Sequence, residues 1–245
     1  MNTPPQFLPA LGHRRLAPLY DPLLRRVMRE DLFKSQLIAS ANLAGLDTLD
    51  LGCGTGTLTL MPRRTNPEAK VVGLDADAEI LVRARAKAAR IGLAIPWVQG
   101  HADRLPHPEA SFDRVLICLV LHHLDPETRY RSLREALRVL RPGGEVHIAD
   151  FGPPRKLAMR VISAIMRHLE HTADLFDGRL PSMLGTVGFV SVAESGRFDT
   201  PLGPLVLLHA SKPRHWDAPR VEMVLPWAGQ GGQTDSGIAL LPGTA

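Results

Sequence analysis

Five short apolar runs alternate with helical segments between residues 46 and 151, and this alternation limits the fold more than any other feature. The runs are rich in Val, Leu and Ile, as expected of strands that are buried on both faces of a parallel sheet. Strand–helix–strand alternation implies right-handed crossovers, so the sequence predicts a doubly wound α/β sheet. The predicted strands are Thr48–Leu51, Val71–Leu74, Ile95–Val98, Phe112–Leu121 and Val146–Phe151.

The helices between these strands carry start and stop signals. One helix is predicted over Ala78–Arg90, and another over Pro126–Leu140, where apolar residues recur at helical spacing. Asp125 is placed to cap the second helix, and Pro126 suits its first position. The segment Pro142-Gly143-Gly144 predicts a turn that leads straight into the next strand.

The last third of the chain changes character. Helices are predicted over Lys156–Leu169 and Arg179–Val187, the second ended by Gly188, and two closing strands over Phe189–Glu194 and Leu205–Ala210. We expect three parts: an N-terminal helical lid (1–45), a catalytic domain (46–212) and a poorly ordered tail (213–245) that is rich in Pro, Gly and polar residues.

Composition excludes several classes of protein. With 245 residues the chain suits one large domain, and 44% apolar residues suffice for a core. Aromatic content of 5% disfavours stacking platforms for nucleic acid. Two cysteines indicate neither a disulfide framework nor a metal site. No apolar run is long enough for an integral membrane segment and no signal peptide is evident, so we expect a cytoplasmic protein. We expect it to be a monomer or a homodimer.

The net charge of +4 comes largely from arginines that recur at helical spacing. Solvated helix faces are the favoured interpretation, and weak attraction to an anionic partner is the alternative. The longer run comprises Arg129, Arg131, Arg134, Arg138 and Arg141.

The segment Leu49-Asp50-Leu51-Gly52-Cys53-Gly54-Thr55-Gly56 is the strongest chemical signal, because it follows a predicted strand and opens a helix. Three glycines let the backbone approach a ligand, and the helix start offers free N–H groups. A dinucleotide fingerprint needs G-x-G-x-x-G. Here the third glycine comes one position early and residue 57 is Thr, which disfavours a nicotinamide-dependent oxidoreductase.

Two acidic residues follow the next two strands. Asp75 ends the second strand, where a carboxylate can accept both ribose hydroxyls of a nucleoside. Capping of the following helix is the alternative, although Asp77 is better placed for that. After the third strand, Gly100-His101-Ala102-Asp103 could contact the edge of an adenine ring.

The order LDLGCGTG, VVGLD, GHADRLP, SFDRVLICLVLHHL, LRPGGEVHIAD resembles class I S-adenosylmethionine-dependent methyltransferases, and most closely the branch of the ubiquinone/menaquinone-biosynthesis C-methyltransferases. The resemblance covers about residues 46–151. It implies a Rossmann-like seven-stranded sheet whose last strand is antiparallel, S-adenosylmethionine as cofactor and a small-molecule acceptor.

The resemblance also implies roles for individual residues. It assigns the methionine part and adenosine backbone of the cofactor to the glycine loop, with Cys53 as a packing residue and not a nucleophile. It assigns the ribose to Asp75, the adenine to the next loops, and the methionine end to the fourth strand. The implied cofactor-binding residues are Asp50, Gly52, Cys53, Gly54, Gly56, Asp75, Ala76, Ala102, Asp103, Cys118 and Leu119.

Candidates for proton transfer lie after the fourth strand. His122 or His123 could serve as the base, since histidine titrates near neutrality, or could position the loop. Tyr20, in a Tyr-Asp pair that resembles one before the core in this branch, could orient the acceptor or simply pack. Residues 158–166 could line an apolar pocket for a quinone- or phenol-like acceptor, although ordinary helix core is the favoured interpretation. A non-catalytic nucleotide-binding module remains a further alternative.

Overall fold

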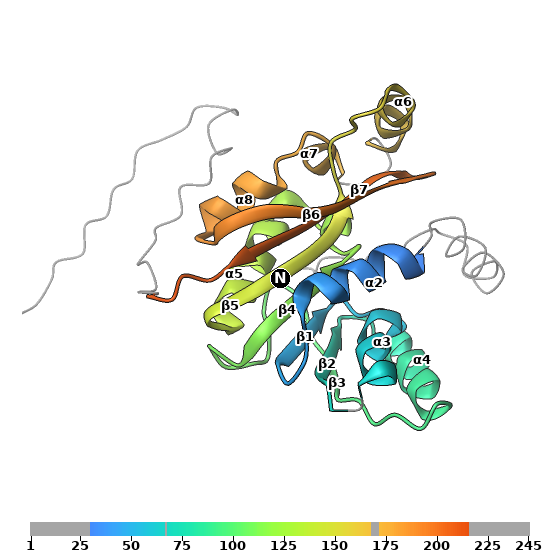
Figure 1. Ribbon diagram of the computed structural model, residues 1–245, viewed down its shortest axis with the longest axis vertical. Coiled ribbons are helices and arrows are strands. Elements are labelled where there is room, and N and C mark those ends of the chain that lie inside the picture. The colour runs from blue at the N-terminus through green and yellow to red at the C-terminus, as the bar shows by residue number, and fades with distance from the viewer. Residues whose placement is uncertain (1–29, 67, 168–171, 216–245) are drawn as a thin grey trace, which may run out of the picture. The chain divides into compact units, whose positions relative to one another are not determined.

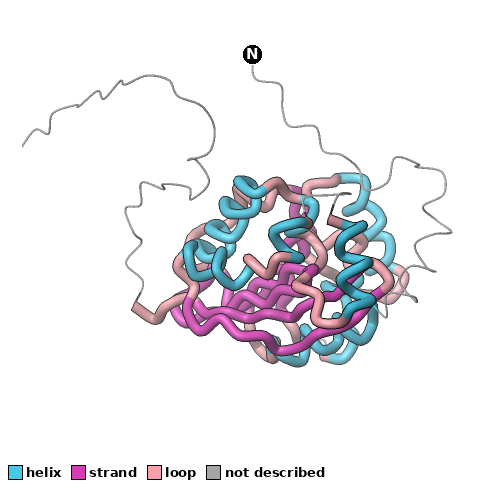
Figure 2. Tube along the Cα trace, turned by 90° about the horizontal axis from the view of Figure 1, so that it is seen from above, coloured by secondary structure: helices cyan, strands magenta, loops and turns pink. Residues whose placement is uncertain are grey.

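A computed structural model describes residues 30–66, 68–167 and 172–215. They form a seven-stranded sheet in the order β3-β2-β1-β4-β5-β7-β6, with helices on both faces (Figures 1 and 2). The strands are β1 Asp47–Leu51, β2 Lys70–Asp75, β3 Trp97–Gln99, β4 Phe112–Cys118, β5 Leu140–Phe151, β6 Val190–Thr200 and β7 Gly203–Ser211. The helices are α2 Glu30–Ala41, α3 Thr57–Thr65, α4 Ala78–Ala89, η1 Leu121–His123, α5 Pro126–Val139, α6 Leu157–Met166, α7 Ala173–Phe176 and α8 Leu180–Val187.

Within the described chain, β7 is the one strand of the sheet that runs opposite to the others. Strands β1 to β5 pair in parallel, whereas β7 is antiparallel to both β5 and β6. This arrangement confirms the predicted doubly wound α/β sheet of seven strands with an antiparallel last strand. The strand order reverses beside β1 and β4, and in such sheets ligands bind outside the carboxyl ends of the strands at this point.

The core lies on both sides of the central strands. Val115, Leu116 and Ile117 of β4 are fully buried, as the continuous apolar run predicts. Figure 1 shows α2 in front of the sheet and α5 behind it. Helix α2 buries Phe33 and Leu37, and α5 buries the apolar stripe of its own sequence.

Three predicted helix ends are confirmed. The Asp77 carboxylate accepts hydrogen bonds from the N–H groups of Glu79 and Ile80, so this residue caps α4. Asp125 caps α5 through the N–H of Thr128, and a proline opens that helix. Gly188 ends α8 in the left-handed conformation, with φ of 113°.

Several predicted strand boundaries are wrong, including the end of β6, which is Thr200 and not Glu194. β3 is Trp97–Gln99 and not Ile95–Val98. β4 stops at Cys118, since Leu119 takes a φ of 59°, which lies outside the extended region of regular strand residues. The predicted turn at residues 142–144 belongs to β5, because Gly143 N–H bonds the carbonyl of Lys212 (3.0 Å) and Lys212 N–H bonds that of Gly144 (2.8 Å).

Helix α6 also differs from the favoured interpretation of residues 158–166 as helix core. Ser163 is the one buried residue in its ten positions, and Leu157 is 77% exposed. An apolar face predicts burial only where another element covers it, and in the described structure none covers this one.

The predicted three-part division stays largely untested. Residues 1–29 of the lid and 216–245 of the tail lie outside the described residues, as does Tyr20. Of the lid, α2 is described, and it packs against β5 and β6. No helix in the described parts of the chain is both long and apolar enough to cross a membrane.

Candidate active site

The carboxyl ends of four parallel strands bring the predicted site residues to one edge of the sheet. Register aligns Leu51 of β1 with Leu74 of β2 and with Ile117 of β4. It also aligns Cys118 of β4 with Ala149 of β5. Residues that immediately follow these positions in the chain therefore start from the same edge.

The glycine loop between β1 and α3 folds tightly over the end of β2. The N–H groups of Gly52 and Cys53 both donate to the carbonyl of Leu74, at 2.8 and 2.9 Å. Gly52, Gly54 and Gly56 have φ values of 73°, 55° and 73°, a region that favours glycine. The loop then delivers the first N–H groups of α3 to the same edge.

The three glycines have different neighbours. A Cβ at Gly52 would lie 2.4 Å from Cγ2 of Val120, and one at Gly56 would lie 2.4 Å from Cη2 of Trp97. A Cβ at Gly54 would meet nothing within 4 Å. Close packing therefore requires glycine at positions 52 and 56. Gly54 instead borders open space, which is what a nucleoside bound against this loop would need.

Asp75 fixes this loop. Its Oδ2 accepts a hydrogen bond of 2.8 Å from Gly54 N–H, and its Oδ1 accepts one of 3.0 Å from Asp77 N–H. Because Asp77 caps α4, the alternative of Asp75 as the helix cap is wrong. Next to it, the carbonyl of Ala76 accepts a hydrogen bond from the side chain of Gln99 (3.3 Å).

Asp50 is a buried carboxylate beneath the loop. It is 1% exposed, and the Thr59 hydroxyl donates to its Oδ2 at 2.6 Å. Burial raises the pKa of Asp50 to about 6, although the Thr59 hydrogen bond opposes that rise. A cationic group bound next to Asp50 would stabilise its charged form.

Lys34 of α2 is a buried cation close to this edge, and its position on an N-terminal helix gave no sequence signal. It is 8% exposed and forms an ion pair with Glu30. Its charge acts to lower the pKa of both Asp50 and Cys118, against the opposite effect of their burial.

Neither cysteine is a thiolate. Burial raises the pKa of Cys118 to about 12, and it also raises the pKa of Cys53 well above the ordinary thiol value. Cys53 is 8% exposed in the glycine loop, as predicted for a packing residue. Neutral thiols are poor nucleophiles, so the site has no covalent route through them.

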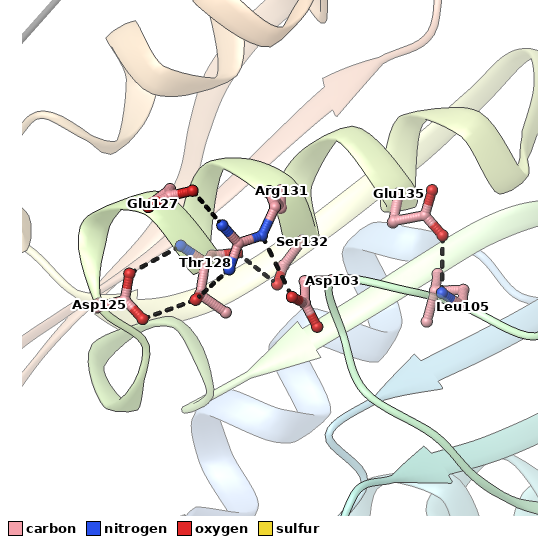
Figure 3. Close-up of polar contacts among 8 residues, drawn as sticks. All are labelled: Asp103, Leu105, Asp125, Glu127, Thr128, Arg131, Ser132 and Glu135. Carbon is pink, nitrogen blue, oxygen red and sulfur yellow. Dashed lines mark hydrogen bonds and ion pairs between the residues drawn. The ribbon is translucent and has the colours of Figure 1, made fainter. Parts of the chain in front are cut away.

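Asp103 is held by α5, which the sequence did not predict. Its Oδ2 accepts from Nε of Arg131 at 3.2 Å, and Arg131 also pairs with Glu127 (Figure 3). The Thr128 hydroxyl accepts a further hydrogen bond of 2.8 Å from the same guanidinium. The loop carrying the half-buried Ala102 and Asp103 is thereby tied to the start of α5.

A second buried pair lies after β4. Nδ1 of His122 is 2.8 Å from Oδ1 of Asp150, and the Asp150 carboxylate also accepts from the N–H groups of Leu121 and Phe151, each at 2.8 Å. Burial alone would raise the pKa of Asp150, but His122 and these N–H groups outweigh it, so the pKa lies below its usual value. The aspartate thus holds one ring nitrogen of His122.

Arg129 stabilises η1 (Leu121–His123), the turn that carries both histidines and is called the histidine turn below. It is fully buried, and its guanidinium donates to the carbonyls of Leu121 and Leu124, each at 2.9 Å. The favoured interpretation of the arginine run as a solvated face is therefore wrong for Arg129. His123, on the same turn, is exposed, and its ring centroid is 3.9 Å from that of His122.

A hollow of about 360 Å³ in the described structure lies elsewhere. Its lining includes Asp47, Lys70 and Phe112, which begin β1, β2 and β4. It therefore opens at the amino edge of the sheet, opposite the glycine loop.

Comparison with known proteins shows which proteins this chain is similar to. Residues 48–144 match a methyltransferase domain. A demethylmenaquinone methyltransferase of Thermus thermophilus is 39% identical over 115 residues, which are 46% of this chain and 51% of that protein. The 2-phytyl-1,4-beta-naphthoquinone methyltransferase of Arabidopsis thaliana is 34% identical over 145 residues, 56% and 55% of the two chains. The chain thus spans about half the length of these relatives.

Solved structures agree on the fold. The apo methyltransferase SibL superposes with a TM-score of 0.63 at 22% identity, covering 83% of this chain and 60% of that one. YcgJ of a Bacillus species gives a TM-score of 0.59 at 17% identity, with coverage of 74% and 97%.

Residues 48–144, which include the glycine loop and Asp75, thus form a methyltransferase domain within the seven-stranded sheet. Over about half their length, demethylmenaquinone and ubiquinone/menaquinone C-methyltransferases are similar in sequence to this chain.

Proposed function

We propose that the protein transfers the methyl group of S-adenosylmethionine to a small, apolar acceptor of the quinone or phenol type. The observation that carries the proposal is the open backbone at Gly54, whose N–H donates to Asp75, with the buried carboxylate of Asp50 in β1 just before the glycine loop. Two relatives are named as methyltransferases of demethylmenaquinone and of 2-phytyl-1,4-beta-naphthoquinone, and these names support the acceptor class.

In this proposal the chain's own residues bind and orient the cofactor. Asp75 accepts the ribose hydroxyls, and Ala76, Ala102 and Asp103 border the adenine. Asp50 stabilises the ammonium group of the methionine part, beside Cys118 and Leu119. When bound, S-adenosylmethionine supplies an activated methyl group, so alignment of the acceptor is the main task left to the protein, worth ~7–11 kcal/mol.

We assign proton removal from the acceptor to the histidine turn. Asp150 holds Nδ1 of His122, an arrangement that fixes ring orientation and stabilises the imidazolium. His123, exposed beside it, is the second candidate. Tyr20 stays a candidate for acceptor orientation, and residues 1–45, 46–212 and 213–245 stay the proposed lid, catalytic domain and tail.

Calorimetry and a methyl-transfer assay test the proposal together. We expect binding of S-adenosylmethionine without binding of NAD, and methylation of at least one member of a panel of quinols and phenols. Binding of NAD alone would favour the oxidoreductase. Cofactor binding without transfer to any acceptor in the panel would favour the non-catalytic module.

A further inference from the structure

Helix α6 presents an apolar stripe to solvent. Leu157, Val161 and Ile165 are 77%, 58% and 63% exposed and recur every four residues, so they lie along one side of the helix. Among the described residues, seven large apolar side chains are strongly exposed, and three of them form this stripe. Isolated exposed apolar residues are ordinary, whereas a contiguous stripe indicates a binding surface.

Basic residues border the stripe. The segment Arg155–Arg167 contains Arg155, Lys156, Arg160 and Arg167 and no acidic residue. Arg160 and Arg167 are seven residues apart and therefore lie on the same flank of the helix. An apolar stripe with arginine and lysine at its sides is typical of a helix that lies in the interface of a membrane.

Acidic groups from neighbouring elements face three of these cations. Arg155 pairs with Glu194 (3.2 Å), Lys156 with Asp199 (2.6 Å) and Arg167 with Asp177 (2.6 Å). The side chains of Arg155 and Lys156 are 69% and 75% exposed. Exposed pairs of this kind are weak, so they leave the cations available to anionic headgroups.

The position of α6 connects it with the candidate active site. The helix begins shortly after the carboxyl end of β5, where Asp150 and Phe151 lie, and it packs against β7. Figure 1 shows α6 standing clear of the layers that cover the sheet. A surface bound by α6 would therefore adjoin the carboxyl edge of the sheet, where the candidate active site lies.

We propose that α6 binds the surface of an anionic lipid bilayer, with Leu157, Val161 and Ile165 among the acyl chains and the basic residues at headgroup level. A second copy of the chain suits this surface less well, since pairing two α6 helices would oppose their arginines. The inference stands apart from the proposed methyl transfer, because it needs neither cofactor nor acceptor.

Vesicle co-sedimentation of the full chain tests the inference. The probes are vesicles of phosphatidylglycerol with phosphatidylcholine, and vesicles of phosphatidylcholine alone. We expect binding to the anionic vesicles that weakens with salt, and at least tenfold weaker binding to the zwitterionic ones.

Two variant pairs isolate α6. Val161→Glu should reduce anionic-vesicle binding at least tenfold, whereas Val82→Glu, which changes a valine that is 61% exposed on α4, should not. Arg160→Glu should reduce binding about tenfold, and Arg83→Glu on α4 much less. Far-ultraviolet circular dichroism checks that each variant is folded.

Three results would overturn the inference. The first is no binding of the wild-type chain to anionic vesicles, and the second is equal binding by the Val161 and Val82 variants. The third is a concentration-dependent dimer in sedimentation velocity that Val161→Glu abolishes, which would assign the stripe to self-association.

Discussion

The carboxylate of Asp75 accepts a 2.8 Å hydrogen bond from the backbone N–H of Gly54. This contact joins the end of β2 to the one loop glycine whose surroundings are open. The residue proposed to bind the ribose therefore also sets the conformation of the loop that would lie beneath the cofactor. The affinity for S-adenosylmethionine and the order of the glycine loop should therefore both depend on the Asp75 side chain.

Replacing Asp75 by Asn should weaken S-adenosylmethionine binding by ~1.5–3 kcal/mol, the range for hydrogen bonds to a charged group. Isothermal titration calorimetry measures this loss. Asp77→Ala is the matched control, since Asp77 caps α4 and should cost ~1 kcal/mol of stability with little change in affinity. Unchanged affinity in a folded Asp75 variant would remove the ribose assignment.

Gly54→Ala separates loop strain from ligand contact. Gly54 and Gly92 have φ of 55° and 69°, and a Cβ at either meets nothing within 4 Å. Alanine should therefore destabilise the protein by a similar ~1–2 kcal/mol at both positions. Gly54→Ala alone should also lower cofactor affinity, at least tenfold. Thermal unfolding and calorimetry on both variants measure the two effects. An equal loss of cofactor affinity in Gly54→Ala and Gly92→Ala would show that the open space at Gly54 does not receive the cofactor.

The buried Asp50 should make the ligand-free protein less stable as pH rises. Its pKa is about 6 in the folded chain and near 3.8 when exposed, so the folded state holds the extra proton between these values. Its contribution to the free energy of unfolding should fall from about pH 4 through pH 6, by on the order of 2–3 kcal/mol. The difference between the wild type and Asp50→Asn in urea unfolding from pH 4 to 7.5 isolates this effect. A pH-independent difference would show that the carboxyl ionises normally.

Binding of the cofactor should release a proton from Asp50 below pH 6. The ammonium group of S-adenosylmethionine would favour the charged carboxylate, which lowers its pKa on binding. At pH 5.5 the calorimetric enthalpy should then depend on the ionisation enthalpy of the buffer, and Asp50→Asn should abolish that dependence. If the dependence persists in the variant, another group supplies the proton.

Asp150→Asn should impair turnover far more than cofactor binding. The asparagine keeps the shape but loses the charge that stabilises a protonated His122, so kcat should fall ~10²-fold or more. S-adenosylmethionine affinity should stay within about threefold. Asp177→Asn, which removes an exposed ion pair with Arg167, is the control and should leave kcat intact. A normal kcat in Asp150→Asn would leave the pair a structural role.

Local sequence was enough to predict the elements and the glycine loop. Alternating apolar runs, the caps at Asp77 and Asp125 and the left-handed Gly188 depend on residues close together in the chain. Their positions are confirmed to within a few residues. The exceptions, such as the segment at Gly143, involve hydrogen bonds to residues far away in the sequence.

Tertiary structure alone decided which side chains meet. The pairs Asp103–Arg131 and His122–Asp150 join residues 28 positions apart, and strand order, not spacing, brings them together. Periodicity likewise marked one face of α6 as apolar but could not say that nothing covers it in the described structure. A helix pattern records which face avoids water, whereas the presence of a covering element depends on packing across the whole fold.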